Sequence, residues 1–446
     1  MNSSLHRLLA ALAFVAFATG ASAQTQTSRP GRPYTGLFGG GIRDTEQMLE
    51  ATGSIASGYD KTLVTTAALD PLIGAENTDG WSPVRSAGYG QFGAGLSYSL
   101  SKRVVEFSAA AASSTRYFPQ FSSRYVPSYS GNIGVSLALS RKSRLTASHL
   151  ASYQPYKTLF FGPAIGNSEL GQAILFDQTL GVRREVFVSQ ASTVTFNRKI
   201  GRRTALDLNY MLGRSDVPAR DSKMRTETKG ARLSTGLTKG LGVHLGYSLT
   251  ESRLGSADVL FRGHSIDAGV DFSRDLSLSR RTRFSFSTGS TAVTEGNNVR
   301  YRINGNANLV REIGRSWAAS LAYVRDVGFI EQFSEPFFSD AATVRLDGLI
   351  SRRLQLYSSV SSVMGQLGLF ADSNTYRSLN ASAGVNAALN RHLALGVEYF
   401  YYGYRFDRQA LLPGNLLQEL GRHSARVSLN AWVPLFHRAR RPDASR

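Results

Sequence analysis

The chain has 446 residues and a mass of 48.5 kDa, with a formal net charge of +19 at pH 7 and no cysteine. The missing cysteine excludes disulfides, thiolate metal ligands and a cysteine nucleophile. Glycine is frequent, at 43 residues, and charged residues make up only 19% of the chain. This composition argues against the two or three soluble domains that the length alone would suggest.

Residues 1–23 have the pattern of a secretory signal peptide. A weakly basic start (1–7) precedes an apolar run (8–18), and the small residues Ala21-Ser22-Ala23 precede Gln24. The pattern predicts export and cleavage near Ala23. No later segment holds the ~20 consecutive apolar residues of a spanning helix, so the sequence does not indicate a helical inner-membrane protein.

From about residue 48 onward, apolar and polar residues alternate in one segment after another. In one such segment, polar or small residues separate Phe92, Ala94, Leu96, Tyr98 and Leu100. A period of two places the two sets on opposite faces of a strand. Segments of about ten residues or more match tilted strands that cross a bilayer, whereas soluble strands are usually shorter.

Short, mostly basic turns join the strands in pairs. We expect them at residues 101–102, 141–142, 199–201, 239–240, 275–281, 313–315, 352–353 and 390–392. Longer connections lie between them, among them 61–86, 155–185, 326–336 and 406–420. Short turns at one end and longer loops at the other are typical of an outer-membrane barrel. A propeller also repeats about every 40 residues, but each interval here holds two long strands rather than four short ones.

The fold class predicted is therefore all-β: a transmembrane antiparallel up-and-down β-barrel of about 18 strands, with 16–18 compatible with the pattern. Eight short turns join sixteen strands, and one strand at each end brings the number to eighteen. A lumen of that width is too large for side chains to fill, so the apolar face should point to lipid. We expect residues 24–47 to form a periplasmic segment, 48–436 the barrel and 437–446 a basic tail. Tyrosines near strand ends would form an interfacial girdle; they are Tyr98, Tyr210, Tyr247, Tyr301, Tyr323, Tyr399 and Tyr401.

Three short motifs carry a resemblance to known proteins. The last strand, 427–436, ends in the aromatic Phe436, as do terminal strands recognised by the outer-membrane assembly machinery, although Pro434 is expected to interrupt it. Together with Leu37-Phe38-Gly39-Gly40 and Gly58-Tyr59-Asp60, it resembles a group of bacterial outer-membrane β-barrel proteins associated with exopolysaccharide-export loci. The resemblance implies a Gram-negative outer-membrane location and a connection with polysaccharide export.

Charged residues of both signs have the parity of the polar face. The candidate lumen-lining set is Asp207, Arg232, Asp267, Asp271, Arg283, Arg300, Arg302, Arg345, Asp347 and Glu398. Such a set favours either a charged conduit for ions or saccharides, or a ladder of cross-strand salt bridges that stiffens the wall.

The connection 155–185 is unusually apolar for a loop, with Phe160, Phe161, Leu175 and Phe176 among its residues. We expect it either to fold into the mouth of the barrel as a constriction or to form one more hairpin above the membrane.

Most of the surplus positive charge lies beside the short turns. These cations are Lys102, Arg103, Arg141, Lys142, Arg144, Arg198, Lys199, Arg202, Arg203, Lys239, Arg280, Arg281, Arg315, Arg352, Arg353 and Arg391. An exported barrel is not expected to meet nucleic acid, so anionic head groups of the inner leaflet are the nearer partner.

No arrangement of residues indicates an enzyme. The histidines are scattered, and none lies in a nucleophile or metal motif. We therefore expect no catalytic residues, no metal site and no cofactor.

The function predicted is a porin-like channel or export conduit for exopolysaccharide or small saccharides. The alternative is a non-conducting scaffold barrel that docks periplasmic export machinery. Outer-membrane lipid and the assembly machinery are the expected partners in both cases.

Overall fold

The structure is a computed structural model that describes residues 45–63, 85–119, 125–154, 187–217, 222–254, 259–275, 281–295, 298–314, 316–329, 336–367, 375–407 and 418–439. Within these ranges, no helix is long and apolar enough to cross a membrane. The predicted signal peptide, the motif at Leu37 and the apolar connection 155–185 lie outside the described residues.

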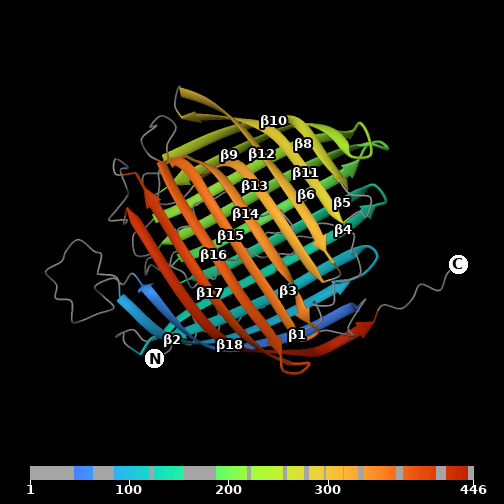
Figure 1. The fold of residues 1–446 in the computed structure, drawn as a ribbon. Helices are drawn as coiled ribbons and strands as arrows, with labels where there is room; N and C mark the ends of the chain where they lie inside the picture. The colour runs from blue at the N-terminus through green and yellow to red at the C-terminus, as the bar shows by residue number, and fades with distance from the viewer. Residues whose placement is uncertain are drawn as a thin grey trace, which may run out of the picture.

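Eighteen antiparallel strands form a single sheet that closes on itself (Figure 1). They are β1 Thr45–Leu63, β2 Arg85–Ser101, β3 Val105–Tyr117, β4 Tyr125–Ser140, β5 Ser143–Gln154, β6 Phe187–Lys199, β7 Thr204–Val217, β8 Ser222–Gly236, β9 Leu241–Leu254, β10 Val259–Asp275, β11 Thr282–Glu295, β12 Asn298–Ile313, β13 Trp317–Phe329, β14 Pro336–Ser351, β15 Leu354–Leu367, β16 Thr375–Ala388, β17 Leu393–Phe406 and β18 Glu419–Ala439.

Each strand pairs with its neighbours in the sequence, and β1 closes the barrel by pairing with both β2 and β18. Ala56, for example, lies between Gln91 of β2 and Ser428 of β18. Closure removes every open strand edge, which hydrocarbon does not tolerate. The predicted up-and-down barrel and its number of strands are confirmed.

The two ends of the barrel differ in their connections. At one end, called the turn side below, eight short connections join β2 to β3, β4 to β5 and so on to β17, at or within two residues of the predicted positions. The chain of the barrel also starts and ends there, at Thr45 and Ala439. The other end, the loop side, has the long connections. Three loop-side connections are nevertheless short, because β8, β10 and β12 begin only a few residues after the preceding strands end.

The apolar side chains point out of the barrel. On β12, Tyr301 and Ile303 are 75% and 71% exposed. The strand pairing carries this outward face around the sheet to Leu245, Val360 and Leu429, all large apolar residues that are also exposed. The opposite, inward face holds buried polar residues, among them Ser136, Thr343, Asp347, Ser361, Asn380, Ser424 and Ser428. A soluble barrel would show the reverse, so this is the pattern of a barrel surrounded by lipid.

The strands are longer than the sequence pattern predicted. β1 begins at Thr45, before the predicted start of the barrel at residue 48, and β18 continues past Phe436 to Ala439. Pro434 does not interrupt β18, so the expected break is wrong. Proline lacks an N–H group and is tolerated where no ladder bond needs one. Here the pairing with β17 has already ended at Ala431, and the pairing with β1 shifts register opposite Leu49 and Glu50.

Candidate functional site: the inward face of the wall

The strand register places the predicted lumen residues on the inward face. Asp207 lies opposite Arg232, and the same row continues through Gly246 to the backbone of Asp267. The backbone of Arg300 follows the same parity on β12. The side chains of Asp267 and Arg300 lie outside the described part of the structure.

Arg232, Asp271 and His244 form one connected group across β8, β9 and β10. Nη2 of Arg232 donates hydrogen bonds to both carboxylate oxygens of Asp271, at 2.8 and 2.9 Å. His244 Nδ1 lies 2.9 Å from Oδ2 of the same carboxylate. The guanidinium reaches across β9 beside Gly246. A Cβ atom added to Gly246 would lie 3.3 Å from the Arg232 Cβ, so the glycine leaves room for the arginine. The group is therefore a cross-strand brace whose charges remain partly open to the lumen.

Asp207 does not pair with Arg232, although the two residues are directly opposite in register. Its carboxylate instead accepts a hydrogen bond from the Asn197 side chain on β6. Because Arg232 is drawn toward β10 and Asp207 toward β6, the inward face there presents separated positive and negative groups.

Two further pairs involve predicted residues. Arg345 and Asp347 are next to each other on the inward face of β14, with Nε and Oδ1 3.6 Å apart. Glu398 of β17 pairs with Arg426 of β18, whose Nε donates to Glu398 Oε2 at 3.0 Å. The Arg426 guanidinium also lies 5.4 Å from the Phe400 ring centroid. Sequence reasoning did not single out Arg426 or Phe400.

Arg283 and Arg302 are not part of these pairs. Arg283 faces Asp275 in register across the β10–β11 pair. Arg302 lies beyond the paired part of β12 and β13, which starts at Gly305. Its guanidinium crosses to the loop-side ends of β14 and β15, 4.5 Å from the Phe338 ring centroid and 2.9 Å from Gln366 Oε1.

A buried ionic cluster lies at the loop side where the barrel closes. Asp60 of β1 accepts a hydrogen bond from Arg422 of β18 at 2.7 Å, and Arg116 of β3 approaches the same oxygen to 3.6 Å. The Asp60 and Arg422 side chains are 0% and 1% exposed. The Arg116 guanidinium lies 4.2 Å from the centroid of the Tyr89 ring.

Buried aromatic residues continue from this cluster along the inward face of β16 and β17. Tyr376, Tyr402, Tyr404 and Phe406 are all almost fully buried. Their rings follow one another at centroid distances of 5.5 to 6.1 Å, from Tyr402 through Tyr404 and Phe406 to Tyr376. An arginine guanidinium can bind the acidic group of a sugar, and an aromatic ring can pack against the sugar ring. Arginines beside aromatic rings therefore suit a saccharide ligand.

The inward face is not equally open around the barrel. The ionic cluster and aromatic row on β1, β3 and β16–β18 are buried. On β5–β8, in contrast, most inward side chains are half-exposed. Two apolar residues with inward register, Leu150 of β5 and Met211 of β7, are exposed. Inward side chains that are accessible among the described residues therefore line β5–β8, and Asn306 of β12 is exposed as well.

Sequence reasoning missed the cluster of Asp60, Arg116 and Arg422. Asp60 and Arg422 are 362 positions apart in the chain, and only barrel closure makes them neighbours. A signal was present in the last strand, where Arg422, Ser424, Arg426, Ser428 and Asn430 form an uninterrupted polar stripe. Among the described residues, no group of three or more His, Asp and Glu side chains could hold a metal ion.

Among the described residues of β8–β10, charged pairs of the outward face lie toward the loop side. On β8, Glu227 pairs with Lys229 at 3.0 Å and lies 3.8 Å from Arg225. On the neighbouring strands, Arg262 and Glu251 pair at 3.0 Å. These groups lie toward the loop side of outward residues such as Leu233 and Leu245, and so limit the lipid-facing band there.

No protein-family model and no curated protein sequence matches this chain. Solved structures with a similar fold include OpdQ of Pseudomonas aeruginosa, with a TM-score of 0.41 and 11% identity over 87% of this chain and 98% of that one. OccAB4 of Acinetobacter baumannii has a TM-score of 0.42 and 10% identity, covering 88% and 99% of the two chains. The siderophore receptor PirA of P. aeruginosa has a TM-score of 0.39 and 9% identity, covering 86% and 80%. Because these similarities are weak, the fold assignment rests on the strand topology itself.

Proposed function

We propose that the protein is an outer-membrane channel or export conduit for saccharides. The observation that carries the proposal is the contrast between the two faces of the wall: apolar residues are exposed outside, and charged groups line a partly open lumen. An apolar exterior around a polar interior suits passage of hydrated solutes through a bilayer. The same proposal includes export by a signal peptide that is cleaved near Ala23, with the residues between Ala23 and β1 in the periplasm and the residues after Ala439 as a tail.

The choice of a saccharide, including an exopolysaccharide, as cargo rests on the chemistry of the inward face. The Arg426 guanidinium lies beside the Phe400 ring, and both side chains are partly exposed, so together they offer the two kinds of contact that acidic or neutral sugars use. The nearby pair of Arg426 and Glu398 supplies further donors and acceptors. A sugar moving through the lumen would then meet these charged groups on β17 and β18 as well as the half-exposed walls of β5–β8.

Ion selectivity tests the conduit directly. In planar bilayers with a salt gradient, the wild-type protein should conduct, and Arg232→Gln should shift the reversal potential toward cation selectivity because a lumen cation is lost while Asp271 remains. Arg225→Gln is the matched control, since Arg225 is on the same strand but faces outward. An equal shift in both variants, or none in either, contradicts the assignment of the β8 lumen face.

A non-conducting scaffold that docks periplasmic export components is the second candidate, and the basic turns favour it. Arg352 and Arg353 at the β14–β15 turn, for example, are exposed and have no carboxylate partner among the described residues. A scaffold predicts no conductance in wild type or in either variant.

The apolar connection 155–185 is the proposed constriction. Deleting residues 160–176, which include Phe160, Phe161, Leu175 and Phe176, should raise single-channel conductance and admit larger saccharides. The reason is that the mouth of the barrel would be wider without the proposed constriction. A heat-modifiable gel band must show that the deleted protein still forms a barrel. Unchanged conductance on folded protein would remove the constriction role from this connection.

A further inference from the structure

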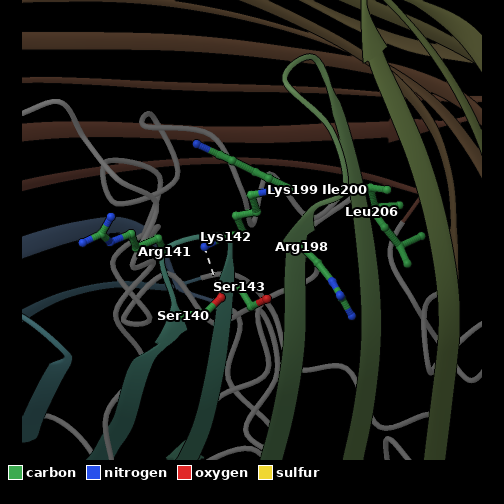
Figure 2. A pocket seen from close by; sticks show the side chains of 8 residues that line it. All are labelled: Ser140, Arg141, Lys142, Ser143, Arg198, Lys199, Ile200 and Leu206. Atoms are coloured by element: carbon green, nitrogen blue, oxygen red, sulfur yellow. Dashed lines mark hydrogen bonds between the residues drawn. The ribbon is translucent and has the colours of Figure 1, made fainter.

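A basic pocket lies on the outside of the barrel at its turn side, between the β4–β5 and β6–β7 turns (Figure 2). It has a volume of ≈ 670 Å³. Arg141, Lys142 and Arg198 line it together with Lys199, whose backbone N–H donates to the Lys142 carbonyl at 2.8 Å and so joins the two hairpins. Lys142 is further held by a hydrogen bond from its backbone N–H to Ser140 Oγ at 3.1 Å.

The pocket faces lipid rather than the lumen. Ser143, Arg198 and Leu206 form one cross-strand row on β5, β6 and β7. This row has the outward parity of Val194 and Phe196 on β6, and Val194 is among the exposed apolar residues. Arg198 therefore projects from the outer surface at the level where the apolar band meets the turns.

Charge at the pocket is uncompensated within the part of the chain that the structure describes. None of its four cations forms an ion pair with a described carboxylate, whereas arginines elsewhere on the wall, such as Arg144, Arg232 and Arg426, do. Apolar side chains adjoin the cations: Ile200 is exposed, and Leu206 lines the pocket. The pocket thus offers cations beside an apolar surface, which matches a molecule with an anionic head and a hydrocarbon tail.

We propose that this pocket binds the phosphate of an anionic phospholipid in the inner leaflet, with its acyl chains against Ile200 and Leu206. The inference rests on the proposed placement of the barrel in a membrane, with the short turns on the periplasmic side, and not on conduction. Arginine and lysine near an anionic bilayer surface attract such head groups, and a site between two hairpins holds the lipid at one position instead of in a diffuse layer.

Lipid binding to the intact barrel in a neutral detergent tests the proposal. Native mass spectrometry with phosphatidylglycerol should show one saturable lipid per barrel, and phosphatidylcholine should not compete for it. Replacing both Lys142 and Arg198 by glutamine should weaken phosphatidylglycerol binding by about tenfold or more, since two cation–phosphate contacts are lost. The control replaces Arg352 and Arg353 by glutamine, which removes the same charge from another turn, and should bind as wild type.

Three outcomes would overturn the proposal. Equal weakening in the pocket and control variants would mean diffuse attraction to the basic turns. Phosphatidylcholine has the same phosphate offset by a choline cation, so its equal binding would mean that the net negative charge of the head group is not recognised. Inorganic phosphate that competes as strongly as phosphatidylglycerol would assign the pocket to a free anion instead of a lipid. Conductance of each variant, measured separately, distinguishes failure of the lipid site from failure of the conduit, because the pocket lies outside the lumen.

Discussion

Replacing Asp60 by asparagine should lower the free energy of unfolding by about 3–5 kcal/mol, the usual penalty for leaving a buried ion without its partner. Asp60 is buried between Arg422 and Arg116, and both guanidinium groups approach the same carboxylate oxygen. Loss of the negative charge would leave two buried arginines facing each other where β1, β3 and β18 come together. Urea-induced unfolding in lipid vesicles, followed by tryptophan fluorescence, measures the difference.

Glu419→Gln provides the control at the same end of the barrel. Glu419 pairs with Arg405 at 3.8 Å, but both side chains are about 70% exposed. Such a pair contributes less than about 1 kcal/mol because water screens it. Similar losses of stability in the two variants would contradict a structural role for burial of the Asp60 cluster.

The second large effect concerns the outward face. Ile55, central on β1, is 58% exposed and lies between Phe92 and Leu429, two further exposed apolar residues. Ile55→Arg should lower the free energy of unfolding in a bilayer by about 2–4 kcal/mol, because arginine near the midplane must leave water. The same unfolding measurement in vesicles gives the value.

Thr52→Arg is the matched variant on the same strand. Thr52 has inward register, opposite Gly95 and Trp432, and is exposed, so its replacement should find lumen water and change stability far less. Equal losses at the two positions, or a larger loss at Thr52, would reverse the assignment of the two faces of β1.

The strands and turns could be predicted because both follow from local patterns. Alternation at Phe92, Ala94 and Leu96 distinguishes the faces of β2 without any knowledge of its neighbours. Turns such as 141–142 and 352–353 interrupt that alternation with polar and basic residues, so their positions and number were visible. The lengths of the strands were underestimated because pairing continues where the alternation fades, as at Pro434.

The partners of the inward charges could be predicted only in part. Parity along each strand selected Arg232 and Asp271, but register would have paired Arg232 with Asp207. The actual contact with Asp271 passes Gly246 on β9, where an added Cβ atom would come within 3.3 Å of the Arg232 Cβ, and no single strand reveals this arrangement.

The sequence by itself determined the barrel class, the number of strands and which face of each strand meets lipid, because period-two alternation and turn spacing are local properties. Only the tertiary structure decided which charges meet. Asp60 and Arg422 become neighbours through the pairing of the first strand with the last, and the basic pocket forms only where two hairpins are side by side. Both depend on sheet closure and on the register between strands, and distance along the chain carries no information about either.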